Sequence, residues 1–332
     1  MADIEVTRGS LVECCHKIHG CIINSDGEIL AHIGNYKKIV YARSSAKPIQ
    51  TIQVIKSGAI KAYNITDEEI ALMCSSHSGQ KMHVDLVSSI LDKANIDESK
   101  LDCGVSMPFD VNSYVKLKED NENLTIKHNT CSGKHSGMLI SAKILGEDLD
   151  SYLDINHPVQ QRILDDIARV CDYNREDIII GIDGCGAPVH ALPLYKIAYG
   201  AARLSDPSKL GDLEAIVDKI TTSMTTYPMM VGGENRFCSE LMDVCNGRIF
   251  GKLGAQGFYL IGDKKNKLGI ALKVEDGSVQ AVECGAVEML RQFNLITNEE
   301  LNKLNKFINP KLKNARGEVI GEMTPQFKLD IK

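Results

Sequence analysis

The chain has 332 residues, a formal net charge of −6 and 43% hydrophobic residues, with no tryptophan. This length allows one large domain or two closely packed ones, and no basic stripe marks a surface for nucleic acid. No apolar run approaches the roughly 20 residues that span a bilayer, and the first ten residues lack the apolar core of a signal peptide. We therefore expect a cytoplasmic protein without a membrane or nucleic-acid partner.

Cysteine usage agrees with this expectation. The chain contains eleven cysteines, an odd number in a long chain without a secretory signal. Such a chain is not a small disulfide scaffold, so we expect mostly reduced thiols. Cys171, Cys245 and Cys284 are typical of the small apolar side chains that fill a core.

The first part of the chain predicts a hairpin followed by helices. Two apolar runs, at 21–24 and 29–33, are separated by the turn sequence "SDG". A helix is expected over 46–61, with Pro48 tolerated because it lies in the first turn. Thr66 followed by Glu69 is a capping-box signal. A further helix is expected over 80–94.

The middle of the chain reads mainly as helices, and strands return near its end. Helices are expected over 136–145, 157–171, 193–203, 209–225 and 236–245. In "DIIIGIDGCGAP" four isoleucines lead into a glycine-rich turn, which predicts a buried strand that ends in a loop. "GFYLIGDKKNKLGIALKVEDG" predicts two strands joined by a charged turn, and "VQAVECGAVEMLRQF" a strand that leads into a helix.

This order of elements predicts an α+β fold. Strands lie near both chain ends, and helices fill the middle from about 45 to 245. We expect one mainly antiparallel sheet built from the two chain ends, with the helices as an insert. No repeat or linker interrupts the sequence, so we expect a single domain over 1–332.

The sequence "ARSSAKPIQ" contains a candidate nucleophile. A serine at i and a lysine at i+3, here Ser44 and Lys47, share one helix face. A desolvated, neutral lysine at that position can take the proton of the serine hydroxyl and activate it. The pattern S-x-x-K also occurs at Ser78/Lys81 and Ser113/Lys116, so by itself it is weak.

Four other stretches are rich in reactive side chains. In "CSSHSGQ", Ser78 or Gly79 can cap the next helix, which leaves Ser76 and His77 without a structural role. The other three are "HNTCSGKHSG" with Cys131, "DGCGAP" with Asp183 and Cys185, and "GKLGAQG" with Lys252. The glycines around Lys252 allow close backbone approach to a ligand.

The cysteines of two of these stretches suggest a metal. Cys131 and Cys185 lie in glycine-containing segments, and two thiolates brought together suit zinc. From residue chemistry alone, His135 is our choice for a third ligand. The alternative is that both cysteines are reduced thiols that line a pocket.

Taken together, these stretches resemble the L-asparaginase II family of rhizobial type. The resemblance runs along nearly the whole chain. It rests on "EVTRG", "RSSAKP", "SSHSGQ", "NTCSGKHSGML", "GIDGCGAP", "VGGENRF" and "KLGAQG", in that order. It implies a fold like that of serine β-lactamases and serine-dependent glutaminases. It also implies L-asparagine as the substrate and a homodimer.

The resemblance assigns roles that the sequence alone cannot link. It implies one Ser–Lys pair, Ser44 with Lys47, and a second pair, Ser76 with Lys252. It also implies zinc held by Cys131, Lys134 and Cys185, in place of our choice of His135.

We add hypotheses for the chemistry and for substrate binding. Ser44 attacks the amide carbon and Lys47, kept neutral by burial and neighbouring positive charge, takes the proton. Arg43 either lowers the pKa of Lys47 or binds the substrate carboxylate. His135 is a further candidate for binding the zwitterion, and Asp183 is the candidate for its ammonium group.

Two other readings remain open at this stage. A penicillin-binding, β-lactamase-like or glutaminase-type hydrolase would keep the serine chemistry with another substrate. Against the first two, the chain has no export signal and no K-T-G sequence before its final strands. The second reading is a zinc-dependent binding protein without catalysis, in which the serines are structural.

Overall fold

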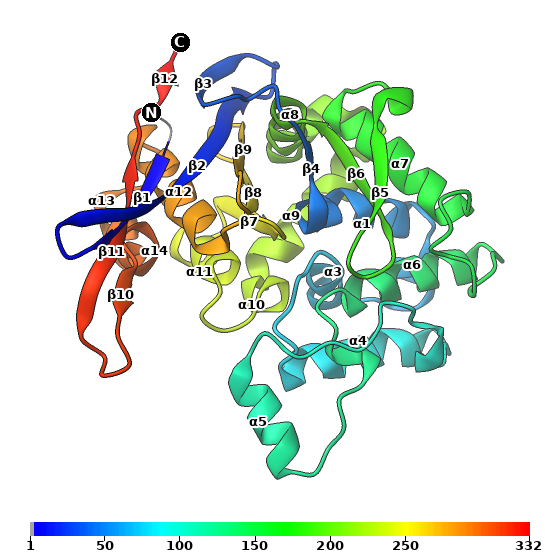
Figure 1. Ribbon diagram of the computed structural model, residues 1–332. Coiled ribbons are helices and arrows are strands. Elements are labelled where there is room, and N and C mark those ends of the chain that lie inside the picture. The colour runs from blue at the N-terminus through cyan, green and yellow to red at the C-terminus, as the bar shows by residue number, and fades with distance from the viewer. Residues whose placement is uncertain (1–2) are drawn as a thin grey trace. The chain divides into compact units, whose positions relative to one another are not determined.

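The computed structural model describes residues 3–332, which form two compact units (Figure 1). Unit 1 contains Met1–Ser45, Leu192–Asp206 and Glu240–Lys332, and unit 2 contains Ala46–Ala191 and Pro207–Ser239. Both ends of the chain thus belong to unit 1, and its middle belongs mainly to unit 2. Our expectation of a single domain over 1–332 stays a prediction.

Unit 1 is built on an antiparallel sheet from the two chain ends, as expected. Seven of its strands follow the order β10-β11-β1-β2-β9-β8-β7, and β3 pairs with β2 and β12. The strands are β1 (Asp3–Arg8), β2 (Leu11–Asn24), β3 (Ile29–Ile33), β7 (Ile249–Gly254), β8 (Phe258–Asp263), β9 (Leu268–Val274), β10 (Lys311–Lys313), β11 (Val319–Gln326) and β12 (Asp330–Ile331). In Figure 1 the blue β1 accordingly lies between β2 and the red β11. The α+β prediction with terminal strands is confirmed.

Two helices pack on this sheet, α8 (Leu194–Ser205) and α12 (Val279–Gln292). A Cβ atom on Gly269 would lie 2.0 Å from the carbonyl oxygen of Ala198, so glycine lets α8 approach β9. A Cβ atom on Gly20 would lie 3.1 Å from the sulfur of Met289 in α12. Gly20 pairs with Leu272, three residues from Gly269, so the two helices cover opposite faces of the sheet.

The predicted hairpins of unit 1 are confirmed, and one predicted strand is wrong. The β2–β3 and β8–β9 pairs match the sequence patterns. The expected strand before the helix in "VQAVECGAVEMLRQF" does not exist, because α12 begins directly at Val279. Ser278 explains this early start, since its hydroxyl accepts a hydrogen bond from the Ala281 N–H at 3.2 Å.

Unit 2 is mainly helical. Its helices are α1 (Lys47–Lys56), α2 (Ala59–Ala62), α3 (Asp67–Met73), α4 (Lys81–Lys93), α5 (Val111–Glu119), α6 (Ser132–Ile144), α7 (Pro158–Cys171), α9 (Glu214–Thr226) and α10 (Pro228–Val231). Buried α1 packs against α6, α7 and α9, which places the residues that begin α1 inside the unit. The capping box of α3 is confirmed, with Thr66 and Glu69 bonded reciprocally.

The predicted helices exist, with shifted boundaries. The expected helix over 46–61 is interrupted after Lys56, where Gly58 adopts a φ of 84°, and α2 follows. The helix expected over 136–145 begins earlier, at Ser132, so its first residues belong to the polar stretch "HNTCSGKHSG". Helix α5 was not expected. The shorter elements are α11 (Phe237–Val244), α13 (Asn298–Lys303), α14 (Asn305–Ile308) and β4 (Ile39–Tyr41).

The strand β5 (Ile179–Ile182) corrects a further prediction. It pairs antiparallel with β6 (Pro188–Pro193) and lies at the edge of its sheet. The sequence predicted a buried strand, but Ile179 and Ile182 are exposed, Ile182 by 83%. The apolar run was misleading because an edge strand is covered on fewer sides than a central one. The predicted loop after it, which carries Asp183 and Cys185, is confirmed.

The cysteines agree with the expectation of mostly reduced thiols. All eleven cysteines are free, and all but Cys14 and Cys15 are buried. None of the helices within residues 3–332 is long and apolar enough to cross a membrane.

Candidate active site

Unit 1 contains three of the predicted site residues, Arg43, Ser44 and Lys252. Arg43 and Ser44 lie in a short 3-10 helix (Arg43–Ala46), where Arg43 has a φ of 52°. A left-handed backbone is rare for a residue other than glycine and is often found at functional sites. The β7 strand lies beside this segment, because a Cβ atom on Gly254 would be 2.8 Å from the Ala42 carbonyl oxygen. Lys252 precedes Gly254 on β7, and its side chain is fully buried.

Unit 2 contains a buried lysine, Lys47, whose amine has several hydrogen-bond acceptors. Lys47 is the first residue of α1 and is only 1% exposed. Its Nζ atom donates to the Ser75 carbonyl at 2.5 Å and to the Ser76 hydroxyl at 3.2 Å. It also lies 3.3 Å from the Cys131 sulfur and 3.5 Å from the Thr130 carbonyl. Lys47 therefore joins the loop that carries Ser76 to the segment that carries Cys131.

The Cys131 sulfur is stabilised as a thiolate. The Cys185 thiol donates a hydrogen bond to it, which favours the thiolate. Burial opposes the negative charge, but the positive charges of Lys47 and Lys134 also favour it. The pKa of Cys131 is therefore held well below its ordinary value. Cys131 is also the N-cap of α6, where the helix dipole favours a negative charge. By the same hydrogen bond and by burial, the pKa of Cys185 is raised, so this thiol keeps its proton.

Lys134 completes the group of residues predicted to bind a metal. Its Nζ atom lies 3.1 Å from the Cys185 sulfur. Burial alone would lower the pKa of Lys134, but the two cysteines outweigh it and the pKa is raised. The structure thus brings Cys131, Lys134 and Cys185 together, beside Lys47. These three side chains fit a zinc ion chemically, since two sulfurs and one nitrogen converge and all are buried.

His135 does not belong to that group. Its Nδ1 atom and the Tyr152 hydroxyl share a hydrogen bond of 2.7 Å, and because that hydroxyl already accepts from the Asp102 N–H at 2.8 Å, we assign the hydroxyl as the donor to Nδ1. Among residues 3–332, no set of three or more His, Cys, Asp or Glu side chains could hold a metal ion. Our choice of His135 as a third ligand beside the two cysteines is therefore wrong. Lys134 and His135 are adjacent on a helix, so their side chains diverge and only one of them points at the sulfurs.

His135 has the properties of a hydrogen-bond donor instead. It is fully buried, and burial together with the charges of Lys134 and Lys47 holds its pKa well below the ordinary value. Because Nδ1 accepts from Tyr152, the proton of the neutral ring lies on Nε2. Within the described part of the chain, that Nε2 atom has no hydrogen-bond partner. A buried N–H group of this kind suits an incoming carboxylate.

Asp183 lies where the sequence predicted, at the end of β5. Its N–H bonds to the Ala187 carbonyl at 2.8 Å, and its carboxylate accepts from the Gly184 N–H at 2.8 Å. The same tight loop carries Cys185. The side chain is partly exposed, so it can meet a ligand from solvent.

Two further histidines of unit 2 were not assigned a role from the sequence. The expectation that His77 lacks a structural role is wrong, because it is buried and bonded to Ser132 at 2.9 Å. His190 lies on β6, and neither ring nitrogen has a partner among residues 3–332. A histidine inside an apolar strand pattern gives no signal of this kind in the sequence.

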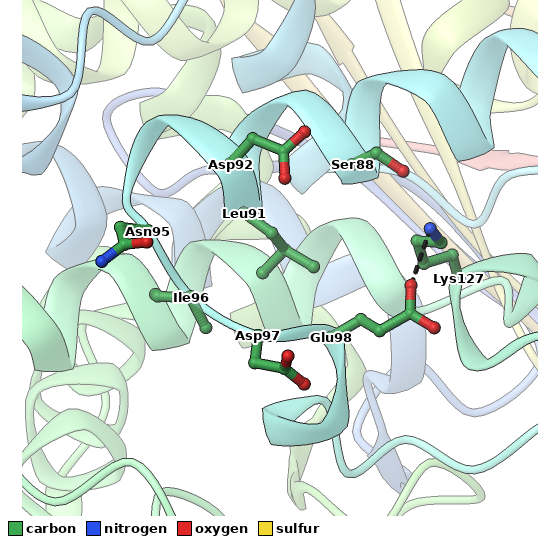
Figure 2. A pocket seen from close by; sticks show the side chains of 8 residues that line it. All are labelled: Ser88, Leu91, Asp92, Asn95, Ile96, Asp97, Glu98 and Lys127. Atoms are coloured by element: carbon green, nitrogen blue, oxygen red, sulfur yellow. Dashed lines mark ion pairs between the residues drawn. The ribbon is translucent and has the colours of Figure 1, made fainter.

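A cavity of about 510 Å³ lies away from these residues (Figure 2). It is lined by Ser88, Leu91, Asp92, Asn95, Ile96, Asp97, Glu98 and Lys127. Two of its carboxylates already have partners: Glu98 pairs with Lys127 at 2.7 Å, and Asp97 accepts from the Ser99 N–H at 2.9 Å. None of the predicted site residues lines it.

Comparisons with known proteins agree with the sequence motifs. The family model described as L-asparaginase II matches residues 4–325. No curated protein sequence matches the chain. Among solved structures, a β-lactamase from Mycobacterium bovis has 13% identity and a TM-score of 0.44, over 83% of this chain and 94% of that one. A candidate β-lactamase from Bacteroides dorei has 9% identity and a TM-score of 0.44, over 78% and 85%.

Proposed function

Because the chain belongs to the L-asparaginase II family, we propose that it hydrolyses the side-chain amide of L-asparagine to L-aspartate and ammonia through a serine acyl-enzyme. The observation that supports this most directly is the contact of buried Lys47 with the Ser76 hydroxyl at 3.2 Å. A serine hydroxyl beside a buried amine is the arrangement that serine acyl transfer requires.

The first step forms the acyl-enzyme. Ser44 Oγ attacks the carboxamide carbon, and Lys47, deprotonated for this step, takes the hydroxyl proton. The C–N bond then breaks, and the departing nitrogen receives that proton and leaves as ammonia. The assignment of Ser44 rests on its spacing in the sequence, three residues before Lys47. The N–H groups at the start of α1 stabilise the oxyanion.

The second step releases aspartate. Water attacks the aspartyl ester, one of its protons returns to Ser44 Oγ, and the other is released to solvent as the acid leaves as a carboxylate. Ser76 and Lys252 relay protons to the leaving nitrogen and from the attacking water. The contact between Lys47 and Ser76 supports this role, because a proton taken by Lys47 can pass to Ser76 directly.

The zwitterionic substrate is held by groups of opposite charge. Asp183 pairs with its ammonium group. Arg43 and the Nε2–H of His135 bind its carboxylate. The unsatisfied, buried Nε2–H supports the role of His135, since a buried donor without a partner costs about 1–3 kcal/mol and a bound carboxylate removes that cost.

Cys131, Lys134 and Cys185 would hold a zinc ion beside this site. Their convergence supports this assignment, although a lysine must lose its proton before it can bind a metal. When bound, zinc supplies positive charge that attracts the substrate. The serines and lysines can provide the nucleophile and the bases without it. We also propose that the protein is cytoplasmic and acts as a homodimer, as the family resemblance implies.

The test is ammonia release from L-asparagine by the purified protein and two variants. Ser44→Ala and Ser76→Ala should each lose at least about 10³-fold in kcat. Ser113→Ala, which alters another S-x-x-K pattern, is the matched control and should keep full activity. If Ser76→Ala is inactive and Ser44→Ala is active, the two serines have exchanged roles. Turnover of glutamine or of nitrocefin in place of asparagine would overturn the proposed substrate.

A further inference from the structure

Two segments of unit 2 flank the Lys47 amine, and both come from polar stretches of the sequence. One carries Ser76, whose hydroxyl lies 3.2 Å from Nζ, and the other carries Cys131, whose sulfur lies 3.3 Å from it. The relative position of these two segments therefore determines which groups surround the amine. His77 follows Ser76, and Ser132 follows Cys131.

A chain of three hydrogen bonds connects the two segments. The Gly79 N–H donates to Nδ1 of His77 at 3.1 Å, so this nitrogen is unprotonated and the ring proton lies on Nε2. Nε2 then donates to the Ser132 hydroxyl at 2.9 Å. That hydroxyl donates in turn to the Lys127 carbonyl at 2.8 Å. The donor and the acceptor of each hydrogen bond are thus fixed, and the chain of bonds extends from residue 79 to residue 127.

The His77 ring is held on its face as well as at its nitrogens. It stacks on the ring of His83, with centroids 5.0 Å apart and an interplanar angle of 16°. His83 is itself fixed, because it accepts from the Gln80 N–H at 3.2 Å and donates to the Met229 carbonyl at 3.0 Å. Only small movements of His77 are compatible with these contacts.

The segment next to His77 has little freedom. Gly79 has a φ of 73°, and a Cβ atom there would lie 2.9 Å from Pro108. The neighbouring Ser78 hydroxyl donates to the Gly232 carbonyl at 2.7 Å. The segment that follows the histidine is therefore anchored to other parts of unit 2.

We propose that His77 and Ser132 are positioning residues, which fix Ser76 and Cys131 at the two sides of Lys47. This inference rests on the proposed function, because it gives the position of Ser76 a catalytic consequence. His77 is adjacent in sequence to Ser76, and Ser132 is adjacent to Cys131. Loss of the hydrogen bond between His77 and Ser132 therefore lets Ser76 move relative to Lys47. Neither residue touches the reacting atoms in this role. A displacement of about 1 Å at a catalytic group can cost up to roughly 10²-fold in rate.

The experiment compares kcat and KM for L-asparagine in four single variants and one double variant. Ser132→Ala removes the acceptor, and His77→Asn keeps the acceptor for Gly79 but is too short to reach Ser132. Both should lower kcat by about tenfold or more and leave KM within about twofold. His77→Gln places an amide N–H near the Nε2 position, so it should keep more activity than His77→Asn. The double variant His77→Asn/Ser132→Ala should be no worse than either single variant.

Ser136→Ala is the matched control. Ser136 lies one turn further along α6, is equally buried, and donates only to the Ser132 carbonyl at 2.9 Å. It should keep the wild-type kcat. If Ser132→Ala also keeps it, or if Ser136→Ala loses as much, or if the effects of the two substitutions multiply, the inference is overturned. Absence of ammonia release by the wild-type protein would instead show that the proposed function is wrong.

Discussion

The histidines of the two units have different partners, carboxylates in unit 1 and hydroxyl or backbone groups in unit 2. In unit 1, His16, His19 and His32 each lie beside a carboxylate, at 2.6, 2.9 and 3.3 Å. In unit 2, His77, His83 and His135 are buried and bond to hydroxyls or backbone groups. Burial is the first cause that lowers the pKa of each of these three rings.

This difference shows that unit 2 tolerates the free-energy cost of burying polar and charged groups. A surface ion pair contributes little to stability and is easily replaced. Buried polar and charged groups cost free energy unless they are paired, and unit 2 gathers Lys47, Lys134, Cys131 and several neutral histidines inside. Lys252 is the exception in unit 1, as a fully buried lysine. Buried ionisable groups of this kind are concentrated at functional sites.

The largest expected effect concerns Lys47, a buried lysine of unit 2, and its measurement tests whether Lys47 acts as a base. Lys47→Met should lower kcat by roughly 10³–10⁴-fold, because it removes the base beside the Ser76 hydroxyl. The measurement is ammonia release by protein whose circular dichroism matches the wild type. Lys81→Met and Lys116→Met are matched controls from the other two S-x-x-K patterns and should keep their activity. A Lys47→Met variant within tenfold of wild type would remove Lys47 from the chemistry.

The sequence predicted much of the fold because its periodic patterns are strong. The strands at both chain ends, the capping box at Thr66 and most helices follow from local signals. The errors occur where tertiary surroundings decide. Ile179–Ile182 has the composition of a core strand, but its place at a sheet edge leaves it exposed. Helix α5 has no buried residue and exposes Val111 and Val115, so it lacks the apolar face that would have identified it.

The second prediction concerns the thiols of unit 2 and uses a buried thiol of unit 1 as control. If zinc is bound by Cys131, Lys134 and Cys185, native mass spectrometry should find about one zinc ion per chain. Cys131→Ser and Cys185→Ser should lose most of it, and Cys245→Ser should not. Affinity should fall as the pH is lowered, because the Lys134 ammonium and the Cys185 thiol, whose pKa values are raised, must be deprotonated. Metal-free protein after purification without chelators would contradict the site.

The third prediction asks whether Asp183 recognises substrate or only shapes its loop. Asp183→Ala should raise KM for L-asparagine by roughly 10- to 100-fold, the cost of one charge-assisted hydrogen bond, with a smaller change in kcat. Succinamic acid lacks the α-ammonium group, so wild type and variant should differ less on it. An equal loss on both compounds would mean that Asp183 holds the loop, through its bonds to Gly184 and Ala187.

The candidate site could be predicted only in part, for a physical reason. Serines, lysines and cysteines in glycine-rich stretches stand out because folding alone does not explain them. Which of them meet is a matter of tertiary structure: nothing in the sequence places Lys47 against Ser76 and Cys131, 29 and 84 residues away. The link from His77 to Ser132 carries no sequence signal at all, and neither does the ring of His190, whose nitrogens have no partner among residues 3–332.

The last predictions concern acid stability, where the two units should respond in separate pH ranges. Burial, and then Lys134, lowers the pKa of His190 from 6.5 to about 4. Between these values the unfolded chain binds a proton that the folded chain does not, so stability falls as the pH drops from 6.5 to 4. The full loss is about 3 kcal/mol. His190→Phe should therefore flatten the pH dependence of the free energy of unfolding in this range, as measured by urea denaturation.

Glu275 of unit 1 provides the counterpart. Lys38 and then His19 lower the pKa of its carboxylate from 4.5 to about 2. The stability that it contributes is complete above pH 4.5 and is lost as the pH falls through about 2. Because this carboxylate is exposed, the effect of Glu275→Gln should be smaller than that of His190→Phe and confined to the lower range. If Glu275→Gln changed the slope between pH 6.5 and 4.5 while His190→Phe left it unchanged, the contrast between paired surface groups and buried neutral histidines would not hold.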